Sequence, residues 1–133
     1  MLIGIPKIIS PELLKVLCEM GHGDQLVIAD GNFPAASCAR RLVRLDGHTV
    51  MDVMEAILTV FPLDLNPMRE IGVMSTGTEQ TPPIWEQFAL HADALIEIDR
   101  YDFYDKAKEA YCIISTSETA LFANALLTKG VVV

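Results

Sequence analysis

Two stretches of the chain carry apolar residues at helical spacing, and each follows a residue that commonly starts helices. Ser10 comes before a leucine-rich face and a proline at the first helical position, which predicts a helix over residues 11–20. We expect Gly21 to end that helix in the left-handed conformation. Thr49 comes before the second repeat, which predicts a packed helix over residues 50–61.

Short apolar runs between polar turns predict the strands of a sheet. The run 25–29 is apolar on both faces, as in a central strand that is covered on each side. Further strands are predicted at residues 42–45, 70–75, 95–98 and 111–114. The stretch 120–127 fits either a helix or a strand, and we favour a strand.

Helical segments separate these strands along the chain. A third helix is expected to open at Thr81 and a fourth to cover residues 103–110, whereas residues 33–37 are expected to form a loop over the end of the central strand. Strands and helices therefore alternate, which is typical of an α/β fold. We predict a single domain over residues 1–133, with a mixed, mostly parallel sheet that helices cover on both faces.

Composition adds information about partners. Of the 133 residues, 51% are hydrophobic and 21% charged, a high ratio for a small monomer, so we expect apolar surface to be buried in a homo-oligomer. The formal net charge of −8 would repel phosphate backbones and anionic lipids. The sequence therefore argues against nucleic acid and membrane partners.

The cysteines and the first residues bear on the compartment. Cys18, Cys38 and Cys112 are odd in number and widely spaced, which is typical of reduced thiols that act as small core residues. Residues 1–9 are apolar but have no basic leader and no small-residue cleavage site, so we do not expect a signal peptide. No apolar run is long enough to span a bilayer. We expect a cytoplasmic protein.

One short segment carries groups suited to proton transfer. His22 lies in a glycine-framed turn after the first helix, and Asp30 closes the central strand, so the segment is expected to bring an imidazole and a carboxylate together at neutral pH. An equally weighted alternative is that His22 only caps the helix C-terminus. Asp30 could instead be an Asx-turn residue that stabilises the bend after the strand.

Other candidate residues would bind a ligand. Arg100 is predicted at a strand end, where its guanidinium offers several donors to a hydroxyl-rich ligand, although an ion pair with Asp99 or Asp102 is the more ordinary role. Asn124 lies in an apolar stretch, and a buried amide needs hydrogen-bond partners; a ligand at a subunit boundary is one way to supply them. The neighbouring aromatics of 101–104 would ordinarily belong to the core or to an oligomer contact. We find no metal triad, no phosphate-binding loop and no convincing Ser or Cys nucleophile.

The sequence resembles the L-fucose mutarotase and D-ribose pyranase family over nearly its whole length. The similarity lies in the helix that ends in Met-Gly-His-Gly-Asp at residues 20–24, in the segment 30–34 and in the segment 100–104. Phe33 followed by proline, together with Arg100, favours the fucose branch, because the ribose branch typically has a histidine at the position of Arg100.

The resemblance implies a ring-based decamer with a cofactor-free sugar site in a cleft between neighbouring subunits. In this family His22 would be the catalytic acid and base, and Asp30 and Arg100 would bind the sugar. Asn124 matches the asparagine of a Tyr-x-Asn motif, but Phe122 stands where the tyrosine is expected. The missing hydroxyl affects the preferred sugar, and the rate, more than the type of reaction.

We therefore expect an isomerase that interconverts the α and β anomers of L-fucose or a similar neutral aldose by opening its ring. His22 would transfer the proton, and Asp30, Arg100, Phe122 and Asn124 would hold the sugar. One alternative is pyranose–furanose interconversion of ribose by the same open-chain route. Others are a sugar-binding protein without catalysis and a purely structural oligomer.

Overall fold

The computed structural model describes all 133 residues and contains five helices and six strands. The helices are α1 (Pro11–Glu19), α2 (Ala35–Cys38), α3 (Val50–Leu58), α4 (Ile84–Ala89) and α5 (Arg100–Glu109). The strands are β1 (Gln25–Ala29), β2 (Leu42–Leu45), β3 (Glu70–Met74), β4 (Ala94–Ile98), β5 (Cys112–Thr116) and β6 (Ala125–Thr128). The longest helix, α5, has ten residues, and no helix has the length and apolar composition that crossing a membrane requires.

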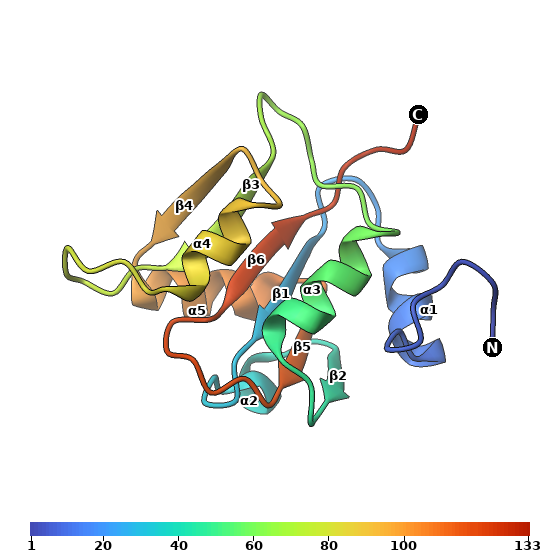
Figure 1. The fold of residues 1–133 in the computed structure, drawn as a ribbon, viewed down its shortest axis with the longest axis horizontal. Helices are drawn as coiled ribbons and strands as arrows, with labels where there is room; N and C mark the ends of the chain where they lie inside the picture. Colours follow the sequence, from blue (N-terminus) through green and yellow to red (C-terminus); the bar gives the residue numbers. More distant parts are fainter.

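All six strands form one sheet in the order β2-β5-β1-β6-β3-β4. β5 runs parallel to both β1 and β2, and β3 runs parallel to β4. β6 lies between β1 and β3 and is antiparallel to both (Figure 1). The predicted mixed, mostly parallel sheet is confirmed, and so is the strand predicted near residues 120–127.

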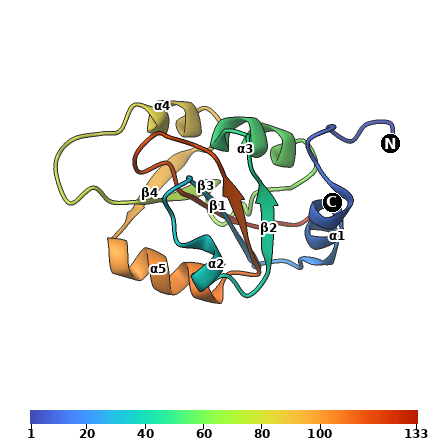
Figure 2. The same ribbon diagram turned by 90° about the horizontal axis from the view of Figure 1, so that it is seen from below.

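Helices cover the two faces of this sheet, as predicted (Figure 2). In β1, Leu26 and Ile28 face a core that also contains side chains of α1, α3 and α4. Val27 and Ala29 face the opposite core, which includes side chains of α2 and α5. The alternation follows from the period of two along a strand, and it explains why the whole of β1 is apolar.

The helix starts predicted at Ser10 and Thr49 are confirmed, whereas α4 begins at Ile84 and not at Thr81 as predicted. The Ser10 hydroxyl accepts a hydrogen bond from the backbone N–H of Leu13 at 3.2 Å, and the Thr49 hydroxyl accepts one from Asp52 at 3.1 Å. α5 starts earlier than predicted, because the Asp99 carboxylate accepts from the backbone N–H of Tyr101 at 3.2 Å and caps the helix. Arg100, expected at a strand end, is thus the first residue of a helix.

Two local predictions are wrong. Gly21 does not have a left-handed backbone, because α1 ends at Met20 in an extended conformation and Gly23 takes the positive φ of 88° instead. The Asp24 carboxylate stabilises this turn by accepting from the Gly21 N–H at 2.8 Å. Residues 35–38 form the short helix α2 where a loop was expected, and buried Ala35 packs in the core beside α5.

Candidate functional site

One edge of the sheet collects the polar residues that end its strands. Asp30 follows β1, Ser75 follows β3 and Asp99 follows β4. β6 runs in the opposite direction, so the residues that precede it, including Phe122 and Asn124, arrive at this same edge. In open α/β sheets ligands collect in the crevice outside the carboxyl ends of strands.

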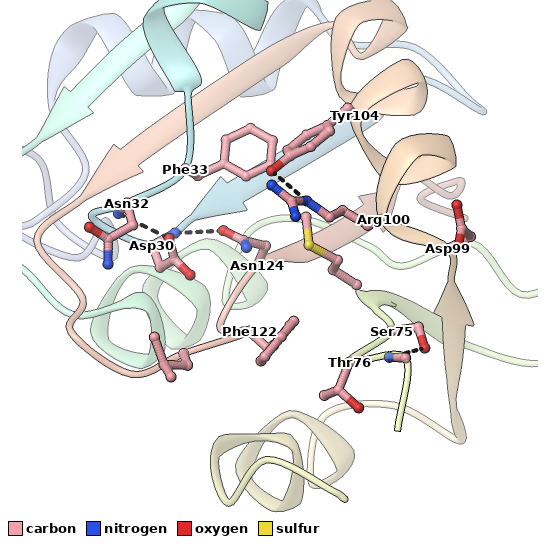
Figure 3. Close-up of a pocket in the computed structure, with 13 residues that line it drawn as sticks. Asp30, Asn32, Phe33, Ser75, Thr76, Asp99, Arg100, Tyr104, Phe122 and Asn124 are labelled. Carbon is pink, nitrogen blue, oxygen red and sulfur yellow. Dashed lines mark hydrogen bonds between the residues drawn. The ribbon is translucent and has the colours of Figure 1, made fainter. Parts of the chain in front are cut away.

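A cavity of about 530 Å³ lies at this edge. Four of the five predicted site residues line it together, and Figure 3 shows them around one hollow: Asp30, Arg100, Phe122 and Asn124. Further walls come from side chains that the sequence did not single out as ligand-binding: Asn32, Phe33, Ser75, Thr76 and Tyr104. The cavity is large enough for a monosaccharide and mixes aromatic surface with directional polar groups, as small-molecule sites do.

Asp30 is the buried acid of the cavity, with 6% of its surface exposed. Its Oδ1 accepts a hydrogen bond from the backbone N–H of Asn32 at 3.1 Å, so the Asx turn considered above is present. Burial raises the pKa of the Asp30 carboxyl, and hydrogen bonds, of which the one from Asn32 has the largest effect, oppose the rise. The Asp30 carboxyl lines the cavity, so a ligand bound there would lie against it.

The side chain of Asn124 ties the start of β6 to the end of β1. Its Oδ1 accepts from the backbone N–H of Asp30 at 2.8 Å, and the residue is 4% exposed (Figure 3). The Asn124 amide also hydrogen-bonds the Asp30 carboxyl and helps to lower its pKa. The buried amide therefore has partners inside its own chain, so a ligand at a subunit boundary is not needed to satisfy it.

Arg100 is held by an aromatic neighbour. Its Nε donates to the Tyr104 hydroxyl at 3.3 Å, and this contact raises the pKa of the guanidinium, which stays charged. The alternative ion pairs with Asp99 or Asp102 are not formed. Tyr104 in turn packs against Phe33, with ring centroids 5.6 Å apart. The aromatic pair supports the guanidinium at the rim of the cavity.

Phe122 has an unusual backbone for an aromatic residue. Its φ of 54° lies in the left-handed region, which side chains of this size rarely adopt. The carbonyl oxygen of Phe122 accepts a hydrogen bond from the indole N–H of Trp85 at 3.0 Å. Trp85 belongs to α4 and is buried in the core, so the core itself holds this wall of the cavity.

His22 does not reach the cavity in its own chain. It precedes β1 whereas Asp30 follows it, and the five residues of the strand separate the two by roughly 16 Å at about 3.3 Å per residue. The expectation that one segment brings this imidazole and this carboxylate together is therefore wrong. A strand is extended, so residues at its two ends lie at opposite edges of the sheet.

The partner of the imidazole is a different carboxylate. Nε2 of His22 lies 3.0 Å from Oδ1 of Asp64, and 60% of the His22 side chain is exposed. The alternative role of His22 as a cap of α1 is also wrong. Lys129 has that role, because its Nζ donates to the carbonyl of Leu17 at 2.8 Å and to that of Met20.

Sequence reasoning missed several of these residues for different reasons. Ser75 and Thr76 lie at the end of the strand predicted over residues 70–75, so the rule that was applied to Asp30 would have found them. Tyr104 was expected in the core or in an oligomer contact, because aromatic side chains dominate both. Asp64 carried no signal at all, since it lies in a loop whose position depends on contacts with distant residues.

The chemistry available is acid–base chemistry and hydrogen bonding. The cavity offers one buried carboxyl, one guanidinium, hydroxyls and an amide. No group of three or more His, Cys, Asp or Glu side chains is placed to hold a metal ion. The only residue predicted for proton transfer, His22, lies at the other edge of the sheet.

Comparisons with known proteins agree with this picture. Residues 3–132 match the RbsD / FucU transport protein family. The fucose mutarotase of Mus musculus is 39% identical over 141 residues, which span 96% of this chain and 92% of that protein.

Two solved structures resemble the fold closely. The fucose mutarotase of Streptococcus pneumoniae in complex with L-fucose has a TM-score of 0.90 and 44% identity, covering 99% of this chain and 100% of that one. FucU from Bifidobacterium longum has a TM-score of 0.88 and 51% identity, covering 98% and 99%. Each match spans the whole domain, so the similarity includes both edges of the sheet.

Proposed function

Because this chain belongs to the RbsD / FucU transport protein family, we propose that it is an aldose mutarotase that interconverts the α and β anomers of L-fucose or a similar neutral sugar. The observation that carries the proposal is the cavity at the carboxyl ends of β1, β3 and β4. Two carboxylates, Asp30 and Asp99, and the Arg100 guanidinium line it, a set that suits uncharged hydroxyls and disfavours a sugar phosphate. Two of the similar proteins named above are fucose mutarotases, one of them solved with L-fucose.

Four residues of the cavity would orient the sugar. Asp30 accepts from its hydroxyls, and burial makes those hydrogen bonds strong because little water competes. Arg100 and the Asn124 amide offer directional donors. The Phe122 ring would pack on the apolar C–H face of the sugar, as aromatic rings do.

The reaction needs only the movement of a proton. The anomeric hydroxyl loses its proton while the bond between C1 and the ring oxygen breaks, and the ring oxygen gains a proton. The product is an open-chain aldehyde, which turns about its C1–C2 bond and closes again by the reverse steps. Both oxygens are attached to C1 in the closed ring, so one imidazole can serve both. No electrons leave the sugar, and no cofactor is required.

His22 is the residue we assign to this proton transfer, and it would act on the cavity of a neighbouring copy of the chain. The support is geometric, because His22 is exposed at the edge of the sheet opposite Asp30 and cannot reach its own cavity. In a ring of subunits, the edge that carries His22 in one copy would lie against the cavity edge of the next copy. We propose that this ring belongs to a decamer, as the resemblance to the family implies. We also propose that the protein acts in the cytoplasm.

Exchange NMR tests the reaction directly. Saturation transfer between the two anomers of L-fucose should become faster with the protein present. His22→Ala should remove roughly 10²–10⁴-fold of that acceleration, the usual contribution of a positioned acid–base group. His48→Ala is the matched control, because His48 is also exposed but does not line the cavity. Unchanged exchange in His22→Ala would refute the assignment.

Mixed assemblies test whether two copies share each site. Chains with His22→Ala and chains with Arg100→Ala should each be nearly inactive, and their co-expression should restore part of the activity. Restoration follows because some sites then receive an intact imidazole from one chain and an intact cavity from the other. If neither single variant is rescued on mixing, the shared site is wrong.

A panel of aldoses separates the remaining functions. Faster pyranose–furanose exchange of D-ribose without an effect on L-fucose would favour a pyranase. Saturable binding without faster exchange of any sugar would favour a sugar-binding protein. Absence of binding to every sugar would leave a structural oligomer.

A further inference from the structure

The loop of residues 117–124, which joins β5 to β6 in Figure 1, brings Phe122 and Asn124 to the cavity. The core holds the later part of this loop, because the Phe122 carbonyl accepts a hydrogen bond from the indole of Trp85. One partly buried side chain, that of Glu118, holds the earlier part. Glu118 does not line the cavity itself.

The Glu118 carboxylate accepts hydrogen bonds from three backbone N–H groups. Its Oε1 accepts from Val50, the first residue of α3, at 3.2 Å. Its Oε2 accepts from Thr119 at 3.0 Å and from Ala120 at 3.1 Å. The two oxygens therefore bridge a helix and the loop that leads to Phe122. A negative charge is favourable beside the free N–H groups of a helix N-terminus, so α3 is a fixed point to which the carboxylate binds.

The backbone of Glu118 ties the same loop to the end of β1. Its carbonyl accepts from the N–H of Gly31, the residue after Asp30, at 2.9 Å. Its N–H donates to the Thr116 hydroxyl at 3.2 Å, and that hydroxyl donates to the Ala29 carbonyl at 2.7 Å. A Cβ on Gly31 would lie 3.1 Å from the Glu118 carbonyl oxygen, so the two backbones are in close contact. Glu118 therefore contacts both the segment of Asp30 and the start of the loop.

We propose that Glu118 is a positioning residue for the wall of the cavity, an inference that rests on the sugar-binding role proposed for Phe122 and Asn124. Phe122 has a left-handed backbone that its own side chain disfavours, so surrounding contacts must hold it. Trp85 holds the carbonyl of Phe122, and Glu118 holds the N–H groups of residues 119 and 120. With both parts of the loop fixed, the sugar does not have to order it on binding.

The experiment compares two changes at the start of α3. Glu118→Gln keeps the size of the side chain, but its single amide oxygen can accept on one side only, and its NH₂ group faces N–H donors on the other. Thr49→Ala removes the hydroxyl that accepts from Asp52 and caps the same helix, while the Glu118 carboxylate stays in place. Both changes should lower Tm, whereas only the first should move the wall of the cavity.

The readouts are anomer exchange of L-fucose and the indole ¹H–¹⁵N signal of Trp85, the only tryptophan of the chain. In Glu118→Gln the KM for L-fucose should rise roughly tenfold, the equivalent of one lost hydrogen bond to a charged group. The kcat should change little, because the proton-transfer role is proposed for His22 at the opposite edge. The indole signal should shift as the Phe122 carbonyl moves. Thr49→Ala should leave the KM and the signal as in the native protein.

Glu118→Asp keeps the inference testable if Glu118→Gln does not fold. The shorter carboxylate can still accept from the N–H of Ala120, two residues further on, as in an Asx turn. It is one methylene too short to reach Val50 as well, so the bridge to α3 is lost. The KM for L-fucose should then rise about threefold, with a smaller shift of the indole signal.

An unchanged KM or an unchanged indole signal in both Glu118 variants would overturn the inference. An equal rise in KM in Thr49→Ala would also overturn it, because the effect would then belong to α3 as a whole. Failure of the proposed function has a separate signature, since the native protein would not accelerate the exchange of any sugar. The indole signal alone would then decide whether Glu118 holds the loop of residues 117–124.

Discussion

The two edges of the sheet differ in how complete they are. At the carboxyl ends of β1, β3 and β4 two polar residues are buried and hydrogen-bonded within the chain, Asp30 with 6% and Asn124 with 4% of its surface exposed. At the opposite edge the His22 side chain is 60% exposed and has one carboxylate partner. The first edge is preorganised for binding, and the second presents a reactive group to whatever lies outside the chain.

This difference shows how a single small domain can divide its work. Burial strengthens the hydrogen bonds of Asp30 but also makes its charge costly, so the cavity suits recognition. An exposed imidazole stays close to solvent and exchanges protons readily. Substitutions at one edge at a time test this difference between the two edges.

The largest effect on the buried edge is expected for Asp30→Asn. The new amide can still accept from Asn32 but loses the charge, which should lower kcat/KM on L-fucose about 10- to 150-fold, since hydrogen bonds to charged groups contribute about 1.5–3 kcal/mol. Steady-state exchange NMR over a range of sugar concentrations measures this. The control is Asp46→Asn, in the exposed turn that follows the edge strand β2.

The same substitution should have the opposite effect on stability. The pKa of folded Asp30 lies above the usual aspartate value of 3.8, so the folded chain binds this proton more tightly than the unfolded chain. The contribution of Asp30 to stability therefore falls as the pH rises from about 3.8 through the raised pKa, and it stays low above it. Asp30→Asn should raise Tm at pH 7 and reduce that dependence on pH. A lower Tm at pH 7 would contradict the burial argument.

A smaller effect is expected for Trp85→Phe, which keeps an aromatic ring in the core but removes the donor to the Phe122 carbonyl. An unsatisfied buried acceptor costs about 1–3 kcal/mol, so Tm should fall and the left-handed backbone of Phe122 should relax. KM should rise about five- to tenfold with little change in kcat, in keeping with roughly 1 kcal/mol of lost positioning. Phe88→Leu, a core change in the same helix, separates this effect from general destabilisation.

Phe122→Tyr should change the preference between sugars modestly. The added hydroxyl can form one more hydrogen bond to a sugar, worth about 0.5–1.5 kcal/mol, which corresponds to roughly a two- to twelvefold change in kcat/KM. Relative rates on L-fucose, D-ribose and other aldoses measure it. If activity is unaltered on every aldose, the hydroxyl is irrelevant in this chain.

The smallest effect concerns the stability of the exposed edge. Asp64→Ala should change the free energy of unfolding by less than about 1 kcal/mol, because exposed ion pairs contribute little. Urea unfolding followed by Trp85 fluorescence measures it, since the chain has a single tryptophan. A loss of several kcal/mol would show that Asp64 supports the fold.

The sequence predicted most of the fold because its signals are local. Ser10 and Thr49 cap helices by contacts three residues away, and the apolar run of β1 reports that both faces are covered. It also predicted that Asp30 lies at a ligand-binding edge, because strand ends in α/β sheets meet there.

What the sequence could not supply depends on distant contacts. The antiparallel insertion of β6 decides that Asn124 meets Asp30 across 94 residues of sequence. The pairing of His22 with Asp64 spans 42 residues and no periodic pattern encodes it. His22 and Asp30 lie close in sequence, but the extended strand β1 lies between them and places them at opposite edges of the sheet.

β6 has a consequence for how this domain tolerates change. Only four residues long, the strand joins the segment of Phe122 and Asn124 to the segment of Lys129 and Gly130, so it sets the spacing between the two edges. Inserting or deleting one residue there would turn its buried side chains toward the wrong face and misplace both functional edges together. We therefore expect β6 to tolerate substitutions but no insertion or deletion.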